Sequence, residues 1–110
     1  MFDRLDEASG NNIRLVDIAP ELEGSIEFIE YASKKCTVSL AHTSAKYEQA
    51  KAGYAAGASH LTHIFNAMPA FTHRAPGVVG AASDDAAHVE MISDGIHLPV
   101  SYTHLTLPTT

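Results

Sequence analysis

Short apolar runs recur along the chain, and segments with helical spacing separate them. Apolar and β-branched residues are frequent in residues 13–19, 37–41 and 87–92, and residues 59–63 (Ser-His-Leu-Thr-His) contain a shorter run of this kind, Leu61 and Thr62. This pattern predicts four β-strands. Because helical segments alternate with the strands, we expect parallel strands joined by right-handed crossovers, which is the α/β class.

The first helix is expected between the first two strands. Leu22, Ile26 and Ile29 fall at i, i+4 and i+7, which predicts an amphipathic helix from Leu22 to about Lys34. Pro20 is expected to open this helix, because proline is favoured in a first helical turn.

The second helix is expected between the second and third strands. Thr43 or Ser44 would provide the hydroxyl that caps its start, and Gly57 would end it through a left-handed turn. One side of this helix is lined by Tyr47, Ala50 and Tyr54. A loop rich in Pro and Gly is expected over residues 66–80.

Two architectures fit this order, namely part of a (β/α)8 barrel and a small doubly wound sheet, and the pattern alone does not choose between them. Residues 99–110 depart from it, because a helix is due there and none is encoded. Their Thr, Leu and Pro bias resembles adaptor read-through. We therefore expect one domain over residues 1–98 and a non-native or disordered tail over residues 99–110.

Length and composition limit the possible functions. The 110 residues allow one domain, and the 45% hydrophobic content is that of a globular protein. A net charge of -6 without a basic cluster argues against nucleic acid as a partner. No apolar run approaches the about 20 residues that span a bilayer, and the start lacks the order of a secretory signal. We expect no membrane partner and a cytoplasmic location.

Histidine is the most informative residue type, with seven in the chain. His42, His63 and His97 fall at or just past the carboxyl ends of predicted strands, where α/β folds place their ligands. His42 and His63 are 21 positions apart, which is the length of one strand, helix and strand return. Both imidazoles are therefore expected to face one point in space.

Strand alternation places His42 on the face of Leu40 and His63 on the face of Leu61, and leaves His60 on the other side. Two neutral imidazoles, a carboxylate and a water are a suitable site for a divalent metal. Such an ion would lower the pKa of bound water toward about 7 and polarise an amide carbonyl. Spacing alone also allows two ordinary polar residues at strand ends.

Four segments carry a more specific signal. They are 41–45 (Ala-His-Thr-Ser-Ala), 62–69 (Thr-His-Ile-Phe-Asn-Ala-Met-Pro), 73–80 (His-Arg-Ala-Pro-Gly-Val-Val-Gly) and 94–97 (Asp-Gly-Ile-His). In order and spacing they resemble the N-acetylglucosamine-6-phosphate deacetylase family of the amidohydrolase superfamily. The resemblance runs from about Ile13 to His97, and it implies a partial (β/α)8 TIM-type barrel of about four consecutive βα units.

The resemblance implies a role for six residues. His42 and His63 match the two metal-binding histidines, for which zinc is the first candidate and iron or another divalent ion stays open. Three positions match residues that bind the sugar phosphate: Asn66, Ala67 and Arg74. His97 matches a histidine that contacts the substrate near the acetamide. A guanidinium fork suits a phosphate.

The chain departs from the family pattern in several places. Ala75 stands where the family usually has an acidic residue, so Arg74 is expected to be less well oriented. The metal-binding glutamate lies on an earlier strand of the family and the aspartate that acts as general base on a later one. We therefore assign no catalytic residue in this chain. Glu21 looks like a structural residue and is not proposed as a ligand.

The resemblance implies that the parent protein hydrolyses N-acetylglucosamine 6-phosphate to glucosamine 6-phosphate and acetate, as a homo-oligomer. The isolated chain is expected to be inactive and poorly soluble, because its first and fourth strands would be open edges. Two alternatives stay open. One is a non-catalytic α/β module that binds a phosphorylated sugar through Asn66, Ala67 and Arg74. The other is an amidohydrolase for another N-acyl or cyclic amide substrate.

Overall fold

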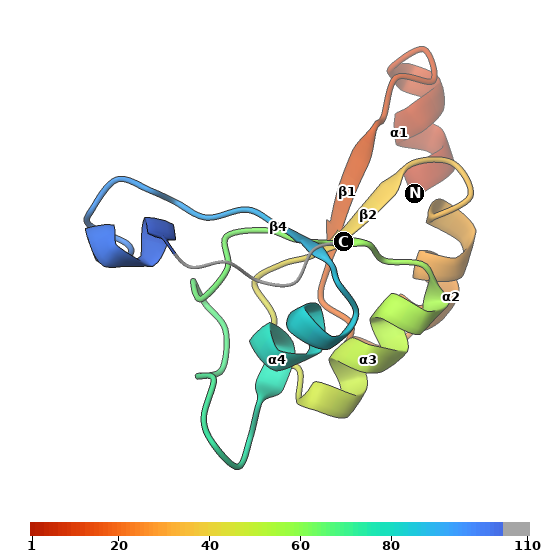
Figure 1. Ribbon diagram of the computed structural model, residues 1–110. Coiled ribbons are helices and arrows are strands. Elements are labelled where there is room, and N and C mark those ends of the chain that lie inside the picture. Colours follow the sequence, from red (N-terminus) through yellow and green to blue (C-terminus); the bar gives the residue numbers. More distant parts are fainter. Residues whose placement is uncertain (105–110) are drawn as a thin grey trace.

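A sheet of parallel strands forms the centre of the computed structural model, which describes residues 1–104 (Figure 1). Its strands pair in chain order: β1 (Leu15–Ile18), β2 (Thr37–Leu40), β3 (His60–Leu61) and β4 (His88–Val89). A doubly wound sheet reverses its strand order at a switch point, whereas a barrel wall continues in one direction. The observed order favours the partial barrel.

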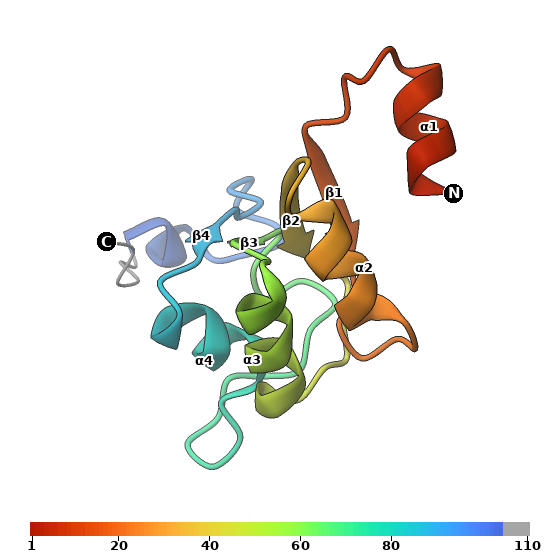
Figure 2. The same ribbon diagram turned by 90° about the vertical axis from the view of Figure 1, so that its right-hand side faces the viewer.

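The helices between successive strands lie side by side (Figure 2). In chain order the helical elements are α1 (Phe2–Ala8), α2 (Ser25–Ala32), α3 (Tyr47–Ala56), α4 (Gly77–Asp84) and the 3-10 helix η1 (Val100–His104). α3 contacts α2 on one side and α4 on the other. Each of these three helices follows one strand and precedes the next, as in consecutive βα units.

The two faces of the sheet differ in chemistry. The helix-covered face is aliphatic, with Val16, Ile18, Val38, Leu40, Leu61 and Val89 in or against the hydrophobic core. The other face carries a row of polar partners across the strands: Asp17, Ser39, His60 and His88. Fully buried aliphatic side chains such as Ile29 and Leu40 each contribute about 1.5–3 kcal/mol by leaving water, so the helix-covered face holds the fold together.

The helix after β1 begins later than expected. α2 starts at Ser25 and not at Leu22, so the prediction that Pro20 opens it is wrong. Gly24 precedes the helix with φ of 79°, a left-handed conformation that interrupts any helix from Leu22. Leu22 is 56% exposed and lies off the apolar face. The Ser25 hydroxyl donates to the Pro20 carbonyl at 2.6 Å, which closes the turn before α2.

The start of α3 also differs from expectation. Lys46, not Thr43 or Ser44, is the residue before the helix. The Lys46 backbone N–H donates a hydrogen bond to Gln49 Oε1 at 2.8 Å. The end is as expected, because Gly57 terminates the helix with φ of 133°. The hydroxyls of Thr43 and Ser44 bind elsewhere, and this bears on the site described below.

Two helices were not expected. α4 begins at Gly77, inside the stretch assigned to a loop, and six of its residues are buried. Its helical period is hidden because it is apolar on all sides. α1 lies against α2, where Phe2 contacts Phe28 and Tyr31 edge to face with ring centroids 6.0 and 6.3 Å apart.

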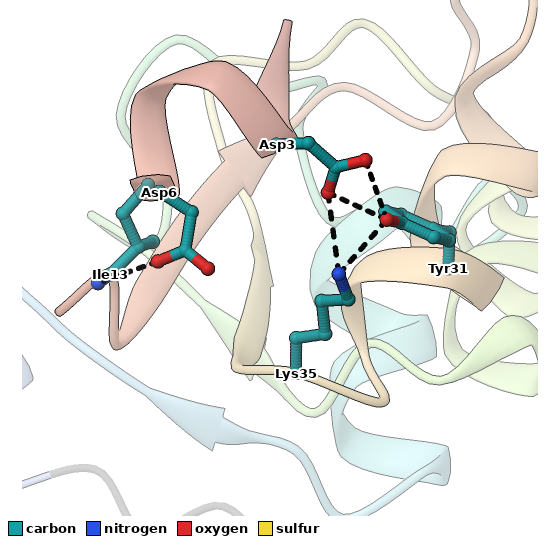
Figure 3. A network of polar contacts seen from close by, with 5 residues as sticks. All are labelled: Asp3, Asp6, Ile13, Tyr31 and Lys35. Carbon is teal, nitrogen blue, oxygen red and sulfur yellow. Dashed lines mark hydrogen bonds and ion pairs between the residues drawn. The ribbon is translucent and has the colours of Figure 1, made fainter. Parts of the chain in front are cut away.

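A polar network also holds α1 against α2 (Figure 3). The Tyr31 hydroxyl donates to Asp3 at 2.6 Å, and Lys35 Nζ lies 3.3 Å from the same carboxylate. The hydrogen bond from Tyr31 holds the pKa of Asp3 below its ordinary value. Asp6 Oδ1 accepts from the Ile13 N–H at 3.3 Å and ties the helix to the approach of β1.

Residues 90–104 extend away from α2 and α3 (Figure 1). In place of the full helix due after β4 they contain only the short η1. Half of the expected tail, residues 105–110, lies outside the described residues, and the other half, residues 99–104, contains η1. Within residues 1–104 no helix has the length and apolar character needed to cross a membrane.

Candidate functional site

The site is organised around two histidines that follow neighbouring strands. β2 ends at Leu40 and β3 at Leu61, and each histidine comes two residues after its strand. The rings of His42 and His63 lie with their centroids 5.9 Å apart and their planes at 67°. His42 is exposed and His63 is half-buried. The spacing of 21 positions therefore brings the two imidazoles together, as predicted.

The alternation of side chains along the strands does not explain why the two imidazoles meet. Strict alternation would carry both side chains to the helix-covered face with Leu40 and Leu61, but neither strand continues that far. The backbone turns instead. Six non-glycine residues of the described chain have positive φ, and four of them are here: His42 (46°), His63 (52°), Phe65 (74°) and Ala67 (53°).

These left-handed positions cost energy. A non-glycine residue in this region is disfavoured by about 1–2 kcal/mol, and such residues persist only where the surrounding contacts determine the backbone. They cluster at functional sites. Their concentration at the carboxyl ends of β2 and β3 marks this region as the candidate site.

A chain of hydroxyl groups lies on the polar face of the sheet and links three strands beneath the two histidines. The hydroxyls of Thr62 and Ser39 are 2.6 Å apart, and Thr62 Oγ1 donates to Asp17 Oδ1 at 3.0 Å. Ser39 and Thr62 are buried. Since Thr62 directly precedes His63, this network fixes the backbone from which that imidazole projects.

A carboxylate from the end of β1 supports the turn after His42. Glu21 accepts hydrogen bonds from the Thr43 hydroxyl and from the Ser44 N–H and hydroxyl, the latter two at 2.9 and 3.0 Å. Partial burial raises the pKa of Glu21, but the hydrogen bonds outweigh it and the pKa lies below its ordinary value. Glu21 is therefore ionised at neutral pH.

The loop after His63 contains the next pair of predicted residues. The Asn66 N–H donates to the His63 carbonyl at 2.9 Å, which forms a tight turn. Asn66 is half-buried and Ala67 is exposed. This turn places the pair next to His63 in space as well as in sequence.

Arg74 lines a pocket of about 280 Å³ between the start of α3 and the 69–77 loop. Lys46 lines the same pocket and adds a second cationic side chain. Arg74 is exposed, and no acidic side chain among residues 1–104 pairs with its guanidinium. Ala75, where an acidic residue was expected from the resemblance, lines the pocket too.

His97 lies on the exposed segment after β4. Its Nδ1 is 2.8 Å from Asp94 Oδ2, while Asp94 Oδ1 accepts from the N–H groups of Ile96 and His97 at 2.8 and 2.9 Å. Several hydrogen bonds lower the pKa of Asp94 to about 2, and the bond from the His97 backbone N–H has the largest effect. Among the described residues no hydrogen bond, ion pair or ring contact joins His97 to His42 or His63.

The donor set fits part of a metal site. Two imidazoles with adjacent rings are suitable ligands for a divalent ion, and imidazole is accepted by zinc, iron and other transition metals alike. Within residues 1–104 no third His, Cys, Asp or Glu joins them in a group able to hold an ion. A complete catalytic site needs a third protein ligand and an open position, so this pair by itself would provide only part of such a site.

Sequence reasoning did not identify Asp17 and Thr62 as supporting residues. Glu21 is expected to be a structural residue and its contacts agree, but the sequence does not indicate its partners, which lie 22 and 23 positions away. For Asp17 and Thr62 a signal existed. A carboxylate within the apolar 13–19 run and a hydroxyl in the run before His63 are polar positions on one face of the sheet, with one strand between them.

The fold and site together define a class. Consecutive parallel βα units with chemistry-bearing side chains beyond the carboxyl ends of their strands form a segment of a TIM-type barrel enzyme. No protein-family profile matches the chain.

Comparison with known proteins narrows the class. The chain is 44% identical over 96 residues to N-acetylglucosamine-6-phosphate deacetylase from Caenorhabditis elegans, covering 81% of this chain and 23% of that protein. It is 39% identical over 99 residues to N-acetylgalactosamine-6-phosphate deacetylase from Escherichia coli O157:H7, covering 88% of this chain and 26% of that protein.

A solved structure agrees. An aspartate-to-alanine variant of N-acetyl-D-glucosamine-6-phosphate deacetylase from Mycobacterium smegmatis, in complex with N-acetyl-D-glucosamine 6-phosphate, superposes with a TM-score of 0.91 at 36% identity. The match covers 99% of this chain and 29% of that structure. The chain therefore belongs to the N-acetylglucosamine-6-phosphate deacetylase family. It spans about a quarter of the length of the curated relatives, from 23% to 26%.

Proposed function

We propose that the full-length protein carrying these residues hydrolyses the acetamide of N-acetylglucosamine 6-phosphate to glucosamine 6-phosphate and acetate. The observation that carries this proposal is the pairing of the His42 and His63 rings, with centroids 5.9 Å apart beyond adjacent parallel strands. Family membership supplies the reaction class, and the ring pair would supply two ligands for the ion that assists the hydrolysis.

His42 and His63 hold a divalent ion in this proposal, with zinc as the first candidate. When bound, such an ion acts as a Lewis acid on the amide carbonyl and lowers the pKa of a water molecule. The third ligand and the general base come from parts of the protein outside residues 1–104. The network of Asp17, Ser39 and Thr62 keeps the His63 backbone in place.

The phosphate group binds to Arg74 and to the turn of Asn66 and Ala67. The Arg74 guanidinium supports this role, because its fork suits phosphate oxygens and it has no acidic partner in the described part of the chain. His97 orients the acetamide. Asp94 is ionised at neutral pH and holds Nδ1 of His97, which favours the tautomer protonated at that nitrogen and leaves Nε2 for the substrate.

The C4 epimer is a second candidate substrate, because an N-acetylgalactosamine-6-phosphate deacetylase is among the relatives at 39% identity. Rates of acetate release from both 6-phosphates and from unphosphorylated N-acetylglucosamine separate the candidates. Loss of activity without the phosphate supports Arg74 as its ligand. A cytoplasmic location and a homo-oligomer stay predictions.

The test is acetate release by a full-length deacetylase that carries these residues. We expect His42→Ala and His63→Ala each to lower kcat/KM by more than about 1,000-fold, which corresponds to about 4 kcal/mol. His60→Ala is the control, because it removes an imidazole from β3, the strand that precedes His63, and it should lower kcat/KM much less. Chelation should abolish activity and added Zn²⁺ restore it. Unchanged kcat/KM in both histidine variants would refute the proposal.

A further inference from the structure

One carboxylate outside the predicted site controls the turn that carries His42. Glu21 lies beyond the end of β1, and both of its oxygens accept hydrogen bonds from the two residues that follow His42 in the chain. Thr43 in turn accepts a hydrogen bond from the Ala45 N–H at 3.0 Å through the same hydroxyl that donates to Glu21. The contacts therefore form a connected set across the ends of β1 and β2.

The turn at His42 requires such support. His42 has φ of 46°, a conformation that costs about 1–2 kcal/mol for a residue with a side chain. Three hydrogen bonds to one ionised carboxylate are stronger than neutral ones, and they act on the two peptide units after His42. Glu21 itself sits in a short turn, where the Leu22 N–H donates to the Ala19 carbonyl at 3.2 Å.

The position of Glu21 raises the question of direct ligation. A glutamate at the carboxyl end of a barrel strand is a common metal ligand. Here both oxygens already accept hydrogen bonds, Oε1 from the Thr43 hydroxyl and Oε2 from the N–H and hydroxyl of Ser44. Moreover, no group of three potential ligands exists among residues 1–104. The contacts of Glu21 are those of a support for the turn.

We infer that Glu21 is a positioning residue, whose carboxylate locks the left-handed turn at His42 and so presents its imidazole to the ion shared with His63. This inference rests on the proposed metal site. Loss of Glu21 releases the turn, so that His42 spends most of its time in other backbone conformations. Metal affinity falls because part of the binding free energy is then used to restore the left-handed turn at His42.

The test measures metal binding in a full-length deacetylase that carries these residues. Zn²⁺ affinity is obtained by competition with a chromophoric chelator, and Co²⁺ substitution reports ligand geometry through its visible absorption. For Glu21→Ala we expect a 10- to 100-fold loss of Zn²⁺ affinity, the range for residues that orient ligands, and a changed Co²⁺ spectrum. Glu21→Gln keeps one oxygen that accepts from Ser44, and it should recover part of the loss.

Glu23→Ala is the matched control, because Glu23 is exposed and has no side-chain partner among the described residues. It should bind Zn²⁺ like the parent. If Glu21→Ala does not fold, the Zn²⁺ affinity of Glu21→Gln tests the positioning role, because a smaller but measurable loss of affinity is expected for that variant.

The outcomes separate the two proposals. Zn²⁺ affinity unchanged in His42→Ala and His63→Ala would refute the metal site itself. If those variants lose the ion while both Glu21 variants keep the parent affinity and Co²⁺ spectrum, only the positioning role is wrong. A loss in Glu21→Ala as large as in His42→Ala, without recovery in Glu21→Gln, would also overturn it and make Glu21 a ligand.

Discussion

Replacement of Thr62 by valine tests the polar network beneath the site. The change keeps the β-branched shape and removes the hydroxyl that bonds both to Ser39 and to Asp17. Valine is as well suited to a strand as threonine. Any loss of stability therefore reports the network and not the strand propensity.

The magnitude follows from the partners left behind. Ser39 is fully buried, and within residues 1–104 its hydroxyl has one other partner besides Thr62, the Leu40 carbonyl at 3.5 Å, which is a weak hydrogen bond. A buried polar group that loses its partner costs about 1–3 kcal/mol. This corresponds to a decrease of about 5- to 140-fold in the ratio of folded to unfolded protein.

The assay is urea unfolding of the full-length protein, where the midpoint should fall while the m-value stays the same. Thr37→Val is the matched control on β2, since the Thr37 hydroxyl has no side-chain partner among the described residues. Ser39→Ala should cost less in the Thr62→Val background than in the parent, because the shared hydrogen bond is already lost. Equal midpoints for Thr62→Val and Thr37→Val would refute the network.

Three further predictions follow from other parts of the chain. Gly80→Ala should raise the KM for the 6-phosphate and cost about 1–3 kcal/mol of stability. The new Cβ at position 80 would lie 2.3 Å from Pro76 Cβ and push Pro76 toward the pocket that Arg74 lines. Ser83→Ala in the same helix should change neither KM nor stability. Asp3→Asn should speed amide hydrogen exchange in α1. Because the hydrogen bond from Tyr31 lowers the pKa of Asp3, the parent should keep this protection above pH 3.8 and lose it as the pH falls through the lower folded value; protection independent of pH would contradict the contact. The isolated 110-residue chain should release no acetate and should form aggregates through the free edges of β1 and β4, whereas a monomer that melts cooperatively would show that these edges are not a liability.

Much of the fold could be predicted because its signals are local. β1 and β2 lie in short runs rich in apolar residues, and the return of 21 positions from His42 to His63 follows from the lengths of a strand and a helix. α4 escaped prediction for a physical reason. A helix buried on all sides has no polar stripe, so Val78 and Val79 look like the continuation of an apolar loop.

The geometry of the site was less accessible. The turns at His42 and His63 have positive φ without glycine, and nothing in their local sequence encodes that conformation. It depends on partners from other strands, such as Glu21 and Asp17, whose contacts form only once the sheet has assembled. For the same reason Thr43 was expected to cap α3, although its hydroxyl serves Glu21 instead.

The most direct test of the account is anomalous diffraction at the zinc edge from crystals of a full-length deacetylase that carries these residues. We predict one strong peak within about 2.0–2.1 Å of a ring nitrogen of both His42 and His63. A peak bound by other residues, with both imidazoles hydrogen-bonded to protein groups, would contradict the assignment of this pair as metal ligands.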